Sequence, residues 1–102
     1  MEDSRMTTQP TIRMDIVIPS FRADVRVLES ICNLDCPDGL ERGVIIVLDN
    51  PDHAVSEEFE AWKLLPDVTI VRNRENLGAN GSRNRGIEET SAEWILFLDD
   101  DI

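Results

Sequence analysis

The apolar residues of this chain are gathered in four short runs, with amphipathic or glycine-containing segments between them. The runs are Met14–Ile18, Val44–Leu48, Val68–Val71 and Trp94–Leu98. In the last run, five large apolar residues follow one another without polar alternation, a pattern typical of a parallel strand buried on both faces. The first run stops at Pro19, which cannot donate to a central ladder. We therefore predict four strands, the last of them buried on both faces.

Two segments between these runs have the periodicity of helices. Residues Asp24–Leu34 place their apolar side chains on one face, with Asp24 as a plausible N-cap. A second helix is expected to open at Ser56, with Phe59 and Trp62 facing inward. The apolar face of the first helix is formed by Val25, Leu28, Ile31 and Cys32.

The segment Asn76–Glu89 is less regular because it contains Gly78, Gly81 and Gly86. Each glycine costs a helix interior roughly 1 kcal/mol relative to alanine, and Asn80-Gly81 is also a hairpin-turn signal. No alternating strands flank that turn, and the chain must cross the sheet here. We therefore predict a helix from about Asn80 to Thr90, whose glycines permit close approach to a neighbour or a ligand.

The resulting order is β-α-β-α-β-α-β. Gaps of roughly twenty residues between strands are long enough for crossover helices, which parallel strands require. We therefore predict an α/β fold with an open, mostly parallel, Rossmann-like sheet. The expected strand order is 3-2-1-4, with the first strand central.

Composition and charge limit the functions that such a domain can have. The chain has 102 residues, 41% of them hydrophobic and 30% charged, as expected for one soluble globular domain. A net charge of −11 argues against sequence-independent nucleic-acid binding and against an anionic membrane surface. Residues 1–12 are expected to be a disordered leader before a folded unit at 13–102. No apolar stretch resembles a secretory signal or a membrane span, so we expect a cytoplasmic protein.

Polar and acidic residues follow three of the predicted strands. They are Pro19-Ser20-Phe21-Arg22, Asp49-Asn50 and Asp99-Asp100-Asp101. In open α/β sheets, ligands bind beyond the carboxyl ends of the strands where strand order reverses, which here lies between the first and fourth strands. These residues are therefore expected to converge on one binding site.

The acidic triplet Asp99–Asp101 is the strongest chemical signal in the chain. Two carboxylates about 4 Å apart repel by roughly 1 kcal/mol in water and about 4 kcal/mol at an intermediate dielectric, so such clusters commonly hold a cation. Oxygen ligands suit Mg²⁺ or Mn²⁺, often shared with substrate phosphates. A solvated acidic segment is the alternative, but the convergence of three strand ends favours a site.

Two other nucleotide sites are excluded by their missing motifs. An apolar strand ending in Asp-Asp also resembles a Walker B strand, but the chain has no GxxxxGK[ST], and Lys63 is its only lysine. No GxGxxG follows the first strand either, which argues against an ordinary dinucleotide site.

Four sequence blocks resemble the amino-terminal half of a family 2 glycosyltransferase with the GT-A fold. Ile16–Arg22 resembles the opening VIIPTYNR of that family, and Val44–Asn50 resembles its IIVVDDGS strand end. Asn76–Gly86 resembles NxG…ARNxG, and Trp94–Asp101 resembles the strand leading into the DXD motif. The resemblance spans roughly Met14–Ile102, and its four blocks stand in the order and at about the spacing of the family.

The resemblance implies a site for a nucleotide-diphosphate sugar linked to UDP, dTDP or GDP, with Mn²⁺ or Mg²⁺ as cofactor. Asp101, with Asp99, would hold the metal against the diphosphate, and Arg83 would add positive charge near the phosphates. Asp49 would contact the base or ribose. The donor-binding residues implied are Pro19, Ser20, Phe21, Arg22, Asp49, Asn50, Gly78, Arg83, Asp99 and Asp100.

The chain also departs from the family pattern. Asn50 and Pro51 replace a common Asp and Gly, which leaves the recognised base open. Family members continue with an acceptor-binding half that supplies the general base, so we assign neither acceptor nor catalytic base here. The alternatives are a truncated or degenerate nucleotide-binding module without transferase activity and an unrelated Mg²⁺-dependent phosphotransfer domain. Self-association through an exposed apolar edge at the last strand is also expected.

Overall fold

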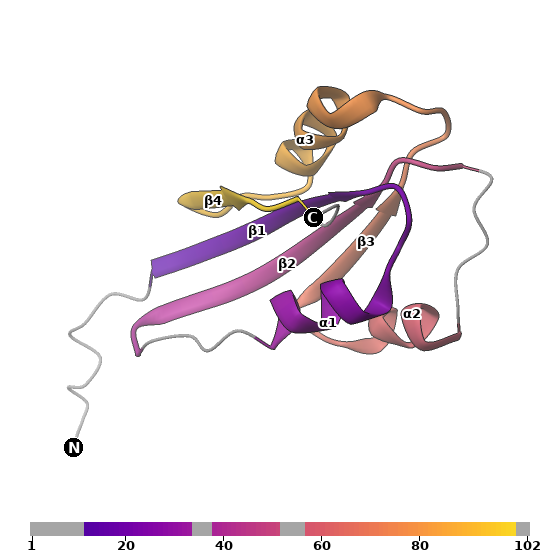
Figure 1. Cartoon of the computed structure of the whole chain (residues 1–102). Helices are drawn as coiled ribbons and strands as arrows, with labels where there is room; N and C mark the ends of the chain where they lie inside the picture. The colour runs from indigo at the N-terminus through magenta and orange to yellow at the C-terminus, as the bar shows by residue number, and fades with distance from the viewer. Residues whose placement is uncertain (1–11, 34–37, 52–56, 100–102) are drawn as a thin grey trace, which may run out of the picture.

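A computed structural model describes residues 12–33, 38–51 and 57–99 (Figure 1). The expected leader lies outside the described residues except for Ile12, which opens the first strand, and Ser56 lies outside them too. The elements are β1 (Ile12–Ser20), α1 (Val25–Cys32), β2 (Leu40–Leu48), α2 (Glu57–Ala61), the 3-10 helix η2 (Trp62–Leu64), β3 (Val68–Arg72), α3 (Gly78–Glu88) and β4 (Trp94–Phe97).

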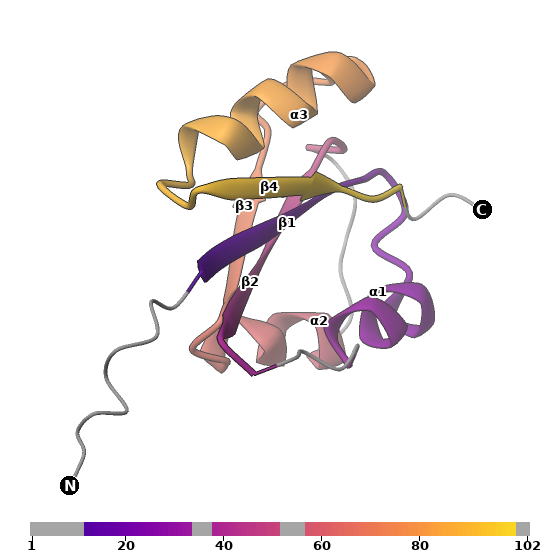
Figure 2. The same cartoon turned by 90° about the vertical axis from the view of Figure 1, so that its left-hand side faces the viewer.

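The four strands form one parallel sheet in the order β3-β2-β1-β4, which confirms the predicted fold class and strand order. Ile16 of β1 lies opposite Val44 of β2 and Leu96 of β4. Helices α1 and α2 cover one face of the sheet and α3 lies on the other (Figure 2). Because β2 and β3 lie on one side of β1 and β4 lies on the other, strand order reverses next to β1, as expected.

The hydrophobic core has two parts because successive side chains of a strand point to opposite faces. On the α1–α2 side, buried strand residues pack with Leu28 and Phe59, both fully buried. Phe59 also lies 5.7 Å from the partly buried Trp62, measured between ring centroids, as the predicted inward orientation requires. The α3 side is smaller and contains Val17, Ile45 and Val47.

The predicted N-cap of α1 is confirmed, since the Asp24 carboxylate accepts a 3.0 Å hydrogen bond from the Arg26 amide. The hairpin reading of Asn80-Gly81 is wrong, because both residues lie within α3. Gly86 brings α3 onto the sheet: a Cβ there would lie 2.3 Å from Cγ1 of Val17. The close approach expected of the glycines is therefore observed at Gly86.

The prediction that β1 stops at Pro19 is wrong. Pro19 lies within β1 and is paired with Val47 of β2. The Leu98 amide donates to the Val17 carbonyl, so the backbone polar groups of Val17 face β4. Every second residue of a strand directs its backbone groups to the same side, so the backbone nitrogen of Pro19 faces β4 too. Pro19 is two residues further on, past the last paired residue of β4. Its missing N–H therefore breaks no ladder hydrogen bond.

The prediction that the fourth strand is buried on both faces is also wrong. Within the described residues β4 pairs only with β1, and it is an edge strand. The side chain of Trp94 is 63% exposed, and Leu96 and Phe97 are exposed as well. An apolar run specifies a strand that can be buried, whereas burial itself depends on what packs against it. No helix in the described ranges is long and apolar enough to span a membrane.

Candidate functional site

A hollow of about 170 Å³ lies at the carboxyl ends of β1 and β2, beside the first turn of α3. We call it the switch-point hollow, because it lies where strand order reverses between β1 and β4. Five of its seven lining residues were predicted from the sequence, and the strand ends do converge. The lining residues are Pro19, Ser20, Phe21, Asp49, Ala79, Ser82 and Asp99.

The turn after β1 shapes one wall of this hollow. The Ser20 hydroxyl accepts a 3.0 Å hydrogen bond from the Ala23 amide. Ala23 has a φ of 53°, a left-handed conformation that is uncommon for residues other than glycine. The turn leaves the Phe21 side chain 52% exposed. An aromatic ring is therefore available at the rim for contact with a flat ligand group.

Asp49 joins the end of β2 to the start of α3. Its Oδ1 accepts hydrogen bonds from the Leu77 amide at 2.6 Å and from Nδ2 of Asn73 at 2.9 Å. Its Oδ2 accepts from the Gly78 amide at 2.8 Å, where Gly78 has a φ of 76°. A carboxylate at this position also complements the positive end of the α3 dipole. The predicted binding residue Asp49 thus also fixes the local backbone.

Asn73 and Ser82 form a buried polar link that the sequence did not reveal. Nδ2 of Asn73 donates to Oγ of Ser82 at 3.0 Å as well as to Asp49, and the Asn73 amide donates to the Leu48 carbonyl at 2.8 Å. Oδ1 of Asn73 is buried without a partner among the described residues. The spacing of the small residues Ala79, Ser82 and Gly86 along one helix face could have indicated this close contact.

Asp99 lies at the rim of the switch-point hollow and pairs with Arg83. Its Oδ1 is 3.3 Å from Nη2 of Arg83, and 61% of its side chain is exposed. Arg83 also donates to Oδ1 of Asn80 at 3.1 Å. An exposed pair of this kind contributes only about 0–1 kcal/mol. Both groups are therefore available to a charged ligand.

The other predicted residues lie around the hollow or outside the described part of the chain. Nδ2 of Asn50 donates to the Phe21 carbonyl at 3.3 Å, which ties the ends of β1 and β2 together. Arg22 is exposed and does not line the hollow. Asp100 and Asp101 lie outside the described residues.

The carboxylates near the switch-point hollow determine whether it could hold a divalent cation. Among residues 12–33, 38–51 and 57–99, no three His, Cys, Asp or Glu side chains are grouped to hold a metal. Both oxygens of Asp49 already accept hydrogen bonds and Asp49 is buried, so Asp99 is the more accessible of the two lining carboxylates. Mg²⁺ is usually held by one or two carboxylates together with substrate phosphates. Asp99 therefore fits an ion shared with a ligand.

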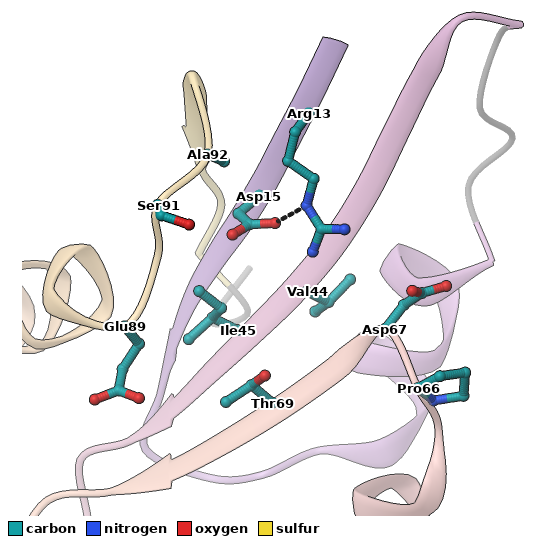
Figure 3. A pocket seen from close by; sticks show the side chains of 10 residues that line it. All are labelled: Arg13, Asp15, Val44, Ile45, Pro66, Asp67, Thr69, Glu89, Ser91 and Ala92. Carbon is teal, nitrogen blue, oxygen red and sulfur yellow. Dashed lines mark hydrogen bonds and ion pairs between the residues drawn. The ribbon is translucent and has the colours of Figure 1, made fainter. Parts of the chain in front are cut away.

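A larger hollow of about 370 Å³, the amino-end hollow, lies near the opposite ends of the strands (Figure 3). Here Nε of Arg13 donates to Oδ1 of the buried Asp15 at 2.9 Å. The Thr90 hydroxyl donates to the other oxygen of Asp15. These groups satisfy one another and tie the segment before β4 to β1. We therefore interpret this hollow as structural.

Gly43 makes room for that cluster, and Gly43→Ala is expected to lower the free energy of unfolding by about 1 kcal/mol. A Cβ at Gly43 would lie 2.2 Å from Nη2 of Arg13 and 2.5 Å from Oδ1 of Asp15. The effect stays moderate because the Arg13 guanidinium is the end of a flexible, partly exposed side chain. Urea denaturation measures it. In a double-mutant cycle with Arg13→Ala, strictly additive costs would contradict this explanation.

Comparisons with known proteins were made on sequence and on structure. Residues 15–102 match the family described as Glycosyl transferase family 2. An uncharacterized glycosyltransferase of Haemophilus influenzae is 34% identical over 89 residues, which cover 86% of this chain and 29% of that protein. The GalNAc(5)-diNAcBac-PP-undecaprenol beta-1,3-glucosyltransferase of Campylobacter jejuni is 24% identical over 91 residues, covering 87% of this chain and 29% of that protein.

Solved structures resemble this chain over about the same share of its length as the sequence relatives do. Residues 1–349 of S. aureus TarS in complex with UDP match with a TM-score of 0.70 and 21% identity, over 88% of this chain and 28% of that one. The same protein in complex with UDP-GlcNAc also gives a TM-score of 0.70, at 20% identity over 88% and 27% of the two chains. At this identity the likeness shows a shared fold. The chain spans less than a third of the length of these relatives.

Proposed function

Because the chain belongs to glycosyl transferase family 2, we propose that it forms the donor-binding half of an enzyme that transfers a sugar from a nucleotide-diphosphate sugar. The proposed donor site is the switch-point hollow. The observation that carries this proposal is convergence: residues after β1, β2 and β4 line one hollow where strand order reverses. That is where open α/β sheets bind their ligands.

The nucleoside would bind at the wall formed by Pro19 and Phe21. The exposed Phe21 ring offers a face for stacking on a flat base. Oδ2 of Asp49 accepts one hydrogen bond from the described residues, at Gly78, and a carboxylate oxygen has two lone-pair sites. Asp49 can therefore accept one more hydrogen bond, from a base N–H or a ribose hydroxyl, while it holds α3.

The diphosphate would lie next to Asp99 and Arg83. We propose that Asp99 and Asp101 hold Mn²⁺ or Mg²⁺ at this end of the site, Asp101 lying outside the described residues. When bound, such an ion neutralises diphosphate charge and favours departure of the nucleoside diphosphate. Arg83 now pairs with Asp99 and can turn to a phosphate oxygen, since an exposed ion pair restrains it weakly.

A UDP-linked sugar is our first choice of donor. The support is the match to TarS structures with UDP and with UDP-GlcNAc, each of which covers 88% of this chain. The Asn50-Pro51 pair follows Asp49 directly, so we expect it to influence which nucleotide base the site binds. We propose no general base among the described residues.

Calorimetric titration with UDP, dTDP and GDP, each with and without Mn²⁺, tests the donor site. We expect binding that depends on Mn²⁺ and is tightest for UDP. Asp99→Asn should weaken UDP binding by about tenfold or more, since it removes a charge from the metal site. Asp67→Asn, an exposed carboxylate near the amino-end hollow, is the matched control and should leave binding unchanged. Absence of metal-dependent binding for all three nucleotides would contradict the proposal.

A further inference from the structure

A third hollow, of about 510 Å³, lies at the carboxyl end of β3, beside the segment that leads into α3. We call it the arginine hollow. It shares no lining residue with the switch-point hollow. Its lining residues are Arg72, Asn73, Arg74, Glu75, Leu77 and Arg85.

The charge of this hollow is opposite to that of the chain. Three guanidinium groups and one carboxylate line it, a formal charge of +2, whereas the whole chain carries −11. Like charges in a shared hollow repel one another unless an anion lies between them. A local positive potential on an acidic protein also selects an anionic ligand over the many neutral ones.

The arginines differ in how firmly they are held. Nη1 of Arg72 donates to the Asn50 carbonyl at 3.4 Å and to the Pro51 carbonyl at 3.3 Å, so its side chain is oriented by the end of β2. Among the described residues, Arg85 is paired only with Glu88, at 3.8 Å and at an exposed position. Arg74 is exposed and makes no hydrogen bond or ion pair within the described ranges. One oriented guanidinium is thus accompanied by two that can move onto a ligand.

We propose that the arginine hollow binds a phosphate-bearing ligand, separately from the donor site and without a divalent metal. Guanidinium groups pair with phosphate oxygens through two parallel N–H···O bonds, a geometry that lysine does not offer. Several arginines on one hollow suit a group with more than one negative charge. The phosphate can belong to a soluble diphosphate compound or to a lipid headgroup, and both present the same oxygens.

Titration of the chain with inorganic pyrophosphate at low salt without metal, followed by NMR, tests this proposal. We expect amide shifts concentrated in residues 72–77 and at Arg85. The double variant Arg74→Ala/Arg85→Ala should bind at least about tenfold more weakly, since it removes two charge-assisted contacts. The double variant Arg26→Ala/Lys63→Ala removes the same charge elsewhere and should bind as the wild type does. Equal affinities for the two double variants, or no shift in residues 72–77, would overturn the proposal.

Two further measurements identify the ligand source and separate this site from the donor site. The first is cosedimentation of the protein with vesicles of phosphatidylglycerol in phosphatidylcholine. Cosedimentation of the wild type that is abolished in Arg74→Ala/Arg85→Ala indicates a lipid headgroup. Pyrophosphate binding without cosedimentation indicates a soluble phosphate compound. Mn²⁺-dependent UDP binding should be unchanged in Arg74→Ala/Arg85→Ala. If the donor-site proposal is wrong, the wild type will therefore fail to bind UDP but will still bind pyrophosphate.

Discussion

Replacing Asp49 by alanine is expected to lower the free energy of unfolding by about 3 kcal/mol and to abolish UDP binding in the switch-point hollow. The carboxylate accepts from two backbone amides and from Nδ2 of Asn73, at distances between 2.6 and 2.9 Å. Leu77 and Gly78 are exposed, so water can replace part of what they lose. Asn73 is buried, and among the described residues its side chain would keep only the hydrogen bond to Ser82.

The charge of Asp49 adds to this effect. A negative group at a helix N-terminus contributes about 0.3–1 kcal/mol, and the α3 dipole would lose it. Asp49→Asn keeps one acceptor oxygen and should therefore fall between the wild type and Asp49→Ala. Urea denaturation followed by circular dichroism measures all three proteins. The exposed Asp38→Ala is the control, and an Asp49→Ala protein as stable as Asp38→Ala would refute the anchoring role.

Gly86→Ala is expected to lower the free energy of unfolding by about 2 kcal/mol, although alanine favours helices. The propensity gain is about 1 kcal/mol. Against it, the new Cβ would lie 2.3 Å from Cγ1 of Val17 and within 3.3 Å of two further Val17 atoms. Val17 is fully buried in the central strand, and its branched side chain cannot swing away as Arg13 can from Gly43. The clash therefore outweighs the propensity gain, since overpacking costs about 1–3 kcal/mol or more.

The consequence of Gly86→Ala should extend to the donor site. Lifting α3 from the sheet displaces Ser82 and Arg83, so UDP affinity should fall together with stability. Asn84→Ala gives the matched control: Asn84 is exposed on the same helix and the variant gains propensity without a clash, so it should stabilise by a few tenths of a kcal/mol. Thermal denaturation compares the two. If Gly86→Ala also raises the melting temperature, the clash with Val17 does not outweigh the gain in helix propensity, and the explanation is wrong.

The strand order was predictable because apolar runs alternate with crossover segments along the chain. That alternation leaves few possible arrangements for a parallel sheet. The positions of Pro19, Asp49 and Asp99 at one hollow followed from that order, since the carboxyl ends of parallel strands meet at one edge. These residues could be assigned to a shared site without any knowledge of side-chain contacts.

The features that escaped prediction depend on three-dimensional neighbours. Pro19 remains in β1 because β4 is shorter than β1 on that side, and no local pattern reveals the length of a distant partner. The exposure of β4 likewise depends on what packs against it. Asn73 and Ser82 form a link across two elements, and buried polar pairs of this kind have no sequence period. The close approach of α3 at Gly86 was the exception, because the glycines of this segment indicated it.

The central position of β1 also determines when the proposed donor site can be completed during protein synthesis. Of the four described strands, β1 is made before the others, and β2 can pair with one side of it as soon as residues 40–48 follow. Its other neighbour is β4, in which Trp94 pairs with Met14, so that edge waits until β2, β3 and α3 have all left the ribosome. Asp99 lies two residues after Phe97, the last residue of β4. The switch-point hollow can therefore gain Phe21 and Asp49 as soon as β1 and β2 have paired, whereas Asp99 is added only after α3 and β4 have been made.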